Sequence, residues 1–298
     1  MGKRKDDEYY KVLALEIEQT GISLTKLAER ESTSRQTLAK RFKMLGIEII
    51  NRQNRPKFNE NVFDIIDTEE KAYWLGFIYA DGYISYNNFE DLTKKPLYSF
   101  ELALQLRDTK HLEKFTKFLS FDYNKVSCDS YRCRVAFANK HLWHVLNNYG
   151  CTPRKSLTLK FPNIEIFKNK DLIKHFIRGY FDGDGCFSRY IYNSGNVVPH
   201  ISFMGTPEFL QELSKFIPAN FSIRKDIRHT DQTITYDFKV DDSVTMINFM
   251  YTNANIYLDR KYTLYNFFKN KSRSLQEYKE LLLGDIGEDC EVNTEIID

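Results

Sequence analysis

The chain contains the stretch Trp74-Leu75-Gly76-Phe77-Ile78-Tyr79-Ala80-Asp81-Gly82 and, further along, the related stretch Ile177-Arg178-Gly179-Tyr180-Phe181-Asp182-Gly183-Asp184-Gly185. Each is an apolar run with small residues four positions apart, at Gly76 and Ala80 in the first and at Gly179 and Gly183 in the second. Residues at this spacing share one face of a helix. Small side chains on that face allow two helix backbones to approach closely. The repeat therefore predicts two helices packed against each other.

Both stretches end in Asp-Gly, at Asp81 and Asp184. The C-terminus of a helix carries partial negative charge, which disfavours a carboxylate there. A second carboxylate close by disfavours ionisation further. A divalent cation offsets both effects, and such ions prefer oxygen ligands. The sequence therefore predicts that Asp81 and Asp184 each hold a divalent cation, for which Mg²⁺ or Mn²⁺ is the expected ion.

The surrounding chain repeats as well. Polar and apolar residues alternate over residues 98–107, which predicts a strand that buries one face of its side chains, from Tyr98 to Leu106. Later strands are expected at residues 132–137 and 236–240, and each repeat closes on a basic phrase that contains Lys155 or Lys261. We expect two near-equal αββαββα units, at residues 68–160 and 161–270.

This pair of motifs resembles that of the LAGLIDADG homing endonucleases in their single-chain form, over about residues 68–270. The resemblance implies an α+β fold in which two pseudo-symmetric halves form a DNA-binding saddle, with active sites beneath the paired helices. It implies a monomeric, metal-dependent enzyme of a mobile element that cuts both strands of DNA at a long, specific target site.

The same resemblance implies roles for particular residues. Asp81 and Asp184 match the metal-binding position of each motif. Lys155 and Lys261 stand where relatives carry a lysine that stabilises the transition state at the scissile phosphate. Phosphate contact without catalysis is the alternative for both lysines. The two motifs differ at Tyr79 and Asp182, a difference that predicts unequal rates for the two strand cuts.

Polar side chains on the open face of each sheet are candidates for reading base edges in the major groove. In the first half they are Ser99, Glu101, Gln105, Arg107, Arg132 and Arg134. In the second half they are Ser202, Arg224, Arg228, Thr235, Asp237 and Lys239. The alternative for each is an ordinary solvated strand face.

Residues 1–47 read as three helices and resemble a small all-α helix-turn-helix domain. Ser34 is expected to open the third helix. In that motif the later helix enters the major groove with its first residues on base edges. Base contacts are then expected from Arg35, Gln36 and Thr37, and phosphate contacts from Lys40, Arg41 and Lys43. A three-helix cap with a charged outer face is the alternative.

The remaining segments differ in charge. Residues 48–67 read as a basic, proline-broken linker, and residues 271–298 as a short helix with an acidic, disordered tail. The net charge is only +2, but a basic body with an acidic tail suits a nucleic-acid partner.

The five cysteines lack a Cys-x-x-Cys pair, which favours reduced thiols in a cytoplasmic compartment. No apolar run is long enough to cross a membrane.

Two other functions remain open at this level. A protein derived from this fold can act as a DNA-binding transcriptional regulator that no longer cuts, or as an RNA maturase. The presence of both acidic helix ends argues against the regulator, because binding alone does not require two crowded carboxylates.

Overall fold

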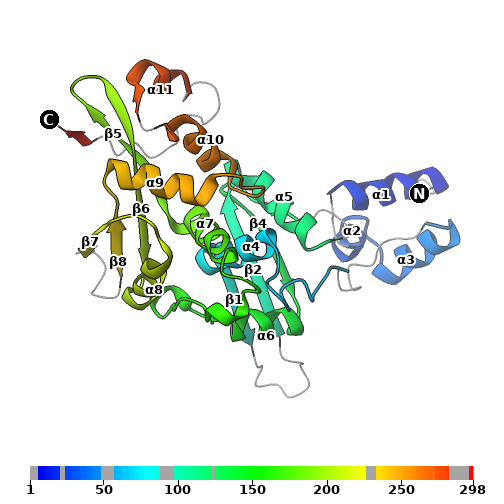
Figure 1. Ribbon diagram of the computed structural model, residues 1–298. Coiled ribbons are helices and arrows are strands. Elements are labelled where there is room, and N and C mark those ends of the chain that lie inside the picture. The colour runs from blue at the N-terminus through cyan, green and yellow to red at the C-terminus, as the bar shows by residue number, and fades with distance from the viewer. Residues whose placement is uncertain are drawn as a thin grey trace. The chain divides into compact units, whose positions relative to one another are not determined.

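The computed structural model describes residues 6–20, 24–47, 57–87, 97–121, 125–225, 233–270, 272–281 and 295–297. The chain forms two compact units, Met1–Lys57 and Phe58–Asp298 (Figure 1). Within the described residues, no helix combines the length and the apolar character that crossing a membrane requires.

The smaller unit consists of α1 (Asp7–Thr20), α2 (Leu24–Arg30) and α3 (Arg35–Met44). Its core is formed by Leu13, Leu27, Leu38 and Phe42. Ser34 is the N-cap of α3, and its hydroxyl accepts a hydrogen bond from the backbone N–H of Thr37 at 3.1 Å. The expected start of the third helix is therefore confirmed.

The larger unit contains two successive αββαββα halves. The first half consists of α4 (Glu69–Asp81), β1 (Gly82–Asn87), β2 (Leu97–Gln105), α5 (Thr109–Phe118), β3 (Ser127–Cys128), β4 (Arg132–Ala138) and α6 (Lys140–Asn148). The second consists of α7 (Leu172–Asp184), β5 (Cys186–Tyr192), β6 (Asn196–Gly205), α8 (Pro207–Leu213), β7 (Ser222–Lys225), β8 (Ile234–Asp237) and α9 (Val240–Tyr251). The predicted fold class is confirmed.

Each half carries one sheet, in which the strands of the αββαββα unit pair antiparallel. The strand order is β1-β2-β4-β3 in the first and β5-β6-β8-β7 in the second. Helices cover one face of each sheet, since Phe100 of β2 shares the core with Leu112 of α5, and Phe203 of β6 shares it with Phe209 of α8 and Met246 of α9. The opposite faces have no such helical cover among the described residues.

The second half continues into α10 (Asp259–Phe268) and α11 (Leu275–Leu281). A short strand, β9 (Arg273–Ser274), joins β6. Ser274 and Glu277 form a capping box at the start of α11, with the Glu277 N–H donating to Ser274 Oγ at 3.2 Å. The tail was expected to lack secondary structure, but residues 295–297 form β10 (Glu295–Ile297), which pairs in parallel with β5. The rest of the acidic tail lies outside the described residues.

The helices α4 and α7 pack closely along the small residues of the two motifs. A Cβ placed on Gly76 would lie closer than 3.0 Å to the backbone carbonyl of Phe176, and one on Gly179 closer than 3.0 Å to that of Tyr73. A Cβ on Gly183 would meet the side chain of Ala80. The predicted helix pair is therefore confirmed, and glycine is required at its crossing because backbone faces backbone.

Two strand predictions are wrong at their ends. Strand β2 stops at Gln105, and residues 106–108 form a 3₁₀ turn, so Leu106 is 43% exposed where burial was expected. Arg107 leaves the sheet with it. Strand β8 ends at Asp237 and α9 begins at Val240, so Lys239 caps a helix and does not lie in a strand. In both cases the alternation of polar and apolar residues continues along the sequence after the backbone has already left the sheet.

Two further segments differ from expectation. Cys128 and Cys133 form a disulfide between directly opposed positions of β3 and β4, where reduced thiols were expected. The end of the expected linker packs into the larger unit, because Val62, Phe63 and Ile66 are buried in its core. Residues 48–56 lie outside the described residues.

Candidate functional site

Asp81 and Asp184 are the last residues of α4 and α7. Gly82 and Gly185 follow in extended conformation and lead directly into β1 and β5. A Cβ on Gly183 would lie 3.0 Å from the Asp81 carboxylate, so this carboxylate reaches the last turn of α7. The close helix crossing thus brings the two acidic helix ends together.

The protein around these carboxylates opposes their ionisation. Desolvation, followed by the charge of Asp184, raises the pKa of Asp81 to about 7. Desolvation also raises the pKa of Asp184, while Lys155 and Lys261 pull it down. Asp81 is half-buried and Asp184 keeps exposed surface. Two carboxylates that are surrounded by protein but still open to solvent are suited to bind a cation.

Lys155 and Lys261 lie at the same helix ends as the acidic pair, and each donates a hydrogen bond to a backbone carbonyl oxygen there. Lys155 Nζ donates to Ala80 O at 3.0 Å, and Lys261 Nζ donates to Gly185 O at 2.5 Å and also to Phe181 O. Desolvation lowers the pKa of both amines, that of Lys261 to about 8. Lys261 is only 2% exposed, whereas Lys155 is half-buried. The four residues assigned to catalysis from the sequence therefore lie in one cluster.

Arg260 belongs to the same cluster and was missed by the sequence interpretation. Its Nε lies 3.2 Å from Asp108 Oδ1 in the first half, and its charge lowers the pKa of both Asp81 and Lys261. Its counterpart Arg154 in the first basic phrase is exposed. The recurrence of Arg-Lys in the two phrases was the available signal, but the partner Asp108 lies far away in sequence.

These groups fit a divalent metal ion. The described residues contain no group of three or more His, Cys, Asp or Glu side chains that could hold a metal. An ion at the helix ends would therefore take the Asp81 and Asp184 carboxylates and complete its shell with other oxygens, as Mg²⁺ commonly does with water.

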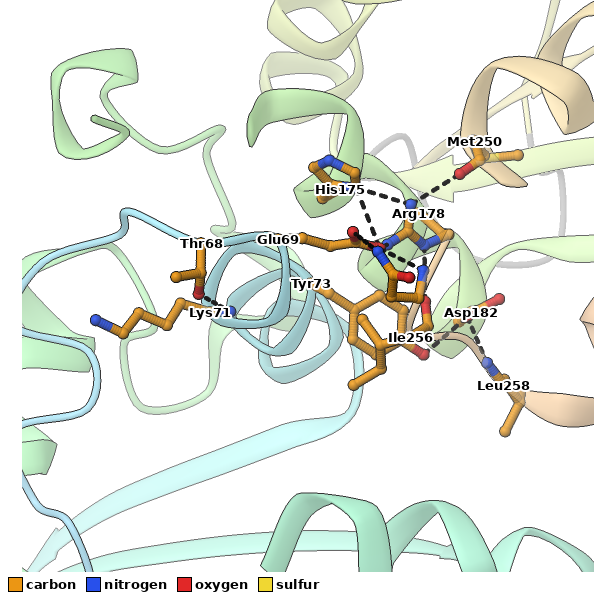
Figure 2. Close-up of polar contacts among 11 residues, drawn as sticks. Thr68, Glu69, Lys71, Tyr73, His175, Arg178, Asp182, Met250, Ile256 and Leu258 are labelled. Atoms are coloured by element: carbon orange, nitrogen blue, oxygen red, sulfur yellow. Dashed lines mark hydrogen bonds and ion pairs between the residues drawn. The ribbon is translucent and has the colours of Figure 1, made fainter. Parts of the chain in front are cut away.

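Asp182, at which the second motif differs from the first, lies in a buried hydrogen-bond network. Its carboxylate is 1% exposed and accepts hydrogen bonds from Tyr73 OH and from the Leu258 N–H, both at 2.8 Å (Figure 2). It also accepts one from Tyr251 OH. In the first half, Tyr79 OH donates instead to the carbonyl of Tyr149. Both residues tie their motif helix to the end of a later helix in the same half.

A buried ion pair joins the two halves at the start of α4. Arg178 of α7 is fully buried, and its Nη2 donates to Glu69 Oε1 at 2.6 Å (Figure 2). Its remaining nitrogens contact the carbonyls of Ile256 and Met250 and the ring of His175. Asn255 donates to both carboxylate oxygens of Glu69 at 2.8 Å. This network sets how the halves pack, and therefore how their helix ends meet.

The sheets place most predicted base readers on their open faces. In the first sheet, β2 and β4 pair Glu101 with Ala136 and Gln105 with Arg132, and these positions alternate with the buried Phe100 and Leu102. The same face carries Ser99 and Arg134 by register. Tyr83, paired with Glu101 and 52% exposed, shares this face and was missed because it follows directly on the Asp-Gly motif.

In the second sheet, the register places Ser202 opposite Asp237 and Thr235 opposite Arg224 on one face. Ser202 and Thr235 are 7% and 4% exposed, so little of either side chain is accessible. Asp237 is in contact with Arg224 and His200. Arg228 lies outside the described residues.

In the smaller unit, Arg35, Gln36 and Thr37 occupy the first turn of α3, for which base contacts were predicted. Arg35, Gln36 and Lys40 are exposed. The Thr37 hydroxyl lies 2.8 Å from Ser34 Oγ, and Arg41 pairs with Asp7 at 2.8 Å. Thr37 and Arg41 are therefore partly engaged within the unit itself.

No family model and no curated protein sequence matches this chain. Among solved structures, the meganuclease I-SmaMI bound to uncleavable DNA is similar over 73% of this chain and 99% of its own, with 12% identity and a TM-score of 0.52. I-GzeII, a LAGLIDADG homing endonuclease in complex with its DNA target, covers 71% of this chain and 92% of its own, with 12% identity and a TM-score of 0.45. I-SmaMI is itself a LAGLIDADG homing endonuclease. The chain thus has the fold of the LAGLIDADG homing endonucleases, with both halves in one polypeptide.

Proposed function

We propose that this protein is a site-specific endonuclease that cuts both strands of DNA with a bound divalent metal ion, Mg²⁺ or Mn²⁺. The observation that carries the proposal is the meeting of Asp81 and Asp184 at two close-packed helix ends, where their surroundings oppose ionisation. A protein that only binds DNA gains nothing from such a pair. I-SmaMI, whose fold this chain shares, has been seen on DNA.

Each polar group at the helix ends then has a chemical task. Asp81 and Asp184 would hold a divalent ion, which when bound would supply activation of water and stabilisation of the leaving oxygen in phosphodiester hydrolysis. Lys155 and Lys261 place positive charge beside the scissile phosphate, and their carbonyl contacts fix that charge in position. The half-buried Lys155 is the more accessible of the two.

We assign recognition of the target sequence to the open faces of the two sheets. From the first half we assign this role to Ser99, Glu101, Gln105, Arg132 and Arg134. From the second half we assign it to Arg224, because Ser202, Thr235 and Asp237 lie on the same face but are largely covered. Two-stranded ribbons of this kind fit the major groove. Arg107 and Lys239, predicted as base readers, lie just outside the strands, and we assign them contacts with the phosphate backbone.

The remaining assignments follow the same logic. The smaller unit adds DNA affinity through Arg35, Gln36, Thr37, Lys40 and Arg41 in and after the first turn of α3. Because both acidic ends belong to one chain, the enzyme acts as a monomer. We assign it to a mobile element as a homing endonuclease, with the cytoplasm of a bacterial or phage-infected cell, or an organelle, as its compartment.

The test is cleavage of a plasmid library of candidate sites in the presence of Mg²⁺. The parent protein should cut a subset of plasmids to linear form. Asp81→Asn and Asp184→Asn should each abolish double-strand cutting while binding to the selected site persists. Asp64→Asn serves as the matched control, because Asp64 is an exposed carboxylate paired with His141 away from the helix ends.

The outcomes separate the possible functions. Full cutting by either motif variant refutes the metal assignment. Selective binding of double-stranded DNA without any cutting, by a well-folded parent in Mg²⁺ or Mn²⁺, indicates the regulator. Preference for structured RNA indicates the maturase.

A further inference from the structure

A chain of four polar side chains crosses the open face of the second sheet. Ser188 Oγ of β5 lies 2.9 Å from His200 Nδ1 of β6. His200 Nε2 lies 3.4 Å from Asp237 Oδ1 of β8, and Arg224 Nε of β7 lies 3.0 Å from Asp237 Oδ2. The register puts all of them on one face, because Ser188 opposes His200, Ser202 opposes Asp237, and Arg224 opposes Thr235.

Asp237 is poorly placed to read DNA itself. Its side chain is 19% exposed, and each of its carboxylate oxygens faces a neighbour. The proximity of His200 and the charge of Arg224 lower the pKa of Asp237, which favours the ionised carboxylate. An ionised carboxylate accepts hydrogen bonds only, and near a duplex it is repelled by the phosphates.

Arg224, in contrast to Asp237, is well exposed to solvent. Its side chain is 68% exposed, and within the described residues the contact with Asp237 is made through Nε. At this exposure the terminal nitrogens of the guanidinium can form a fork towards a ligand. A guanidinium fork matches guanine O6 and N7 in the major groove, which is the commonest specific arginine contact. An arginine that is already held loses less side-chain freedom on binding.

We propose that Arg224 is a specificity-determining residue that reads one guanine of the target, and that Asp237 is its positioning residue. The proposal rests on the proposed DNA-binding function. His200 Nε2 lies 3.4 Å from the other carboxylate oxygen, and His200 is itself held by Ser188, so the Asp237 carboxylate is confined between His200 and Arg224. Asp237, assigned from the sequence as a reader, thereby acts through Arg224.

Arg134 offers a matched comparison on the first sheet. It is also an exposed strand arginine, yet no ion pair to its side chain occurs in the described part of the chain. If Arg134 reads a base, it does so without an ion pair that holds its side chain in position. Substitutions at Arg134 and at Asp237 should then act independently, since the two residues belong to different halves.

The experiment selects bound sequences from a randomised DNA library with the full-length protein, in Ca²⁺ to prevent turnover. The variants are Arg224→Ala, Arg224→Lys, Asp237→Asn, the double variant Arg224→Ala/Asp237→Asn and the control Arg134→Ala. The readout is the base preference at each target position, and thermal melting of each variant verifies folding.

The parent should prefer guanine at one position of the second half-site. Arg224→Ala should reduce that preference by roughly 5- to 150-fold, the range of one good bidentate pair. Arg224→Lys should keep overall affinity but lose the preference, because an ammonium lacks the fork. Asp237→Asn should weaken the preference at the same position, and the double variant should be no worse than Arg224→Ala.

Other results overturn the proposal. A changed preference at a different position in Asp237→Asn would make Asp237 a reader in its own right. An unaltered preference in a folded Asp237→Asn variant would remove the positioning role, and an unaltered one in Arg224→Ala would remove the reading role. A parent protein that selects no DNA at all refutes the proposed function itself, an outcome distinct from each of these.

Discussion

Lys155 and Lys261 hold corresponding positions in the two halves, but their surroundings differ. Lys155 is half-buried and contacts one carbonyl, whereas Lys261 is 2% exposed and contacts two. A half-buried carbonyl can be rehydrated when its donor is lost, but a buried one cannot. We therefore expect Lys261 to contribute more to the stability of the fold than Lys155 does.

The first prediction compares Lys155→Met with Lys261→Met. Lys155→Met should lower the single-turnover cleavage rate by about a hundredfold or more, with little change in melting temperature. Lys261→Met should slow cleavage and also reduce the free energy of unfolding by about 1 to 3 kcal/mol, because the buried Phe181 carbonyl and the half-buried Gly185 carbonyl each lose a hydrogen bond from the amine. If Lys261→Met melts like the parent, its carbonyl contacts do not stabilise the fold.

The second prediction concerns the pH dependence of stability through His175. Desolvation and the charge of Arg178 lower the pKa of His175 to about 4, below the value of about 6.5 expected in the unfolded chain. Between these values the unfolded chain binds a proton that the folded protein does not. Stability should therefore be complete above about pH 6.5 and fall as the pH decreases towards 4.

His175→Asn isolates this effect, because the asparagine amide oxygen can accept the Arg178 hydrogen bond but does not titrate. Urea unfolding of parent and variant at pH 7 and pH 5 gives the difference. The parent should lose about 1 to 2 kcal/mol more than the variant between these two values. Parallel pH profiles would mean that His175 titrates normally in the folded protein.

At the scale of elements, the pairing of α4 with α7 dominates the molecule. It determines where Asp81 meets Asp184 and which residues of the two halves form the Glu69–Arg178 network. A single added methyl group at the crossing has to displace backbone, because the nearest atoms to Gly76 and Gly179 are backbone carbonyls. Interiors packed at this density do not absorb such a group cheaply.

The third prediction is that Gly76→Ala and Gly179→Ala each destabilise the protein by about 1 to 3 kcal/mol or more. Alanine ordinarily stabilises a helix relative to glycine, so the sign of the effect is diagnostic. Gln211→Ala, at an exposed position of α8, provides the control. Thermal melting measures both, and a rise in melting temperature for Gly179→Ala would contradict the close crossing.

At the scale of the whole molecule, the chain joins a small helical unit to a larger unit that already holds both acidic ends. Two linked DNA-binding parts reinforce each other, because the second contact becomes intramolecular. Affinity and chemistry should therefore be separable within one chain.

The fourth prediction tests this separation with the triple variant Arg35→Ala/Gln36→Ala/Lys40→Ala in the full-length protein. The variant should bind the target at least about tenfold more weakly and show a flatter salt dependence, because phosphate contacts are lost. Cleavage under excess protein should remain. Lys11→Ala, which removes an exposed cation from α1, is the control. An unchanged salt slope in the triple variant would make the smaller unit a cap or a docking unit for another protein.

The sequence by itself determined what repeats locally. The small residues of the two motifs predicted the helix pair, the alternation predicted β2, and matched positions predicted that Asp81, Asp184, Lys155 and Lys261 cluster. These features are visible because periodicity and repetition are properties of neighbouring residues along the chain. The roles assigned to those four residues stay predictions.

Only the tertiary structure decided which partners these residues meet. Arg260 finds Asp108, Arg178 finds Glu69, and Asp237 holds Arg224, in each case across a gap in sequence that no periodic pattern encodes. The same reason explains why the strand ends at Leu106 and Lys239 were placed wrongly. Whether a polar residue reads DNA, pairs with a neighbour or caps a helix depends on the direction of the backbone in space, and that direction is set by packing between distant segments.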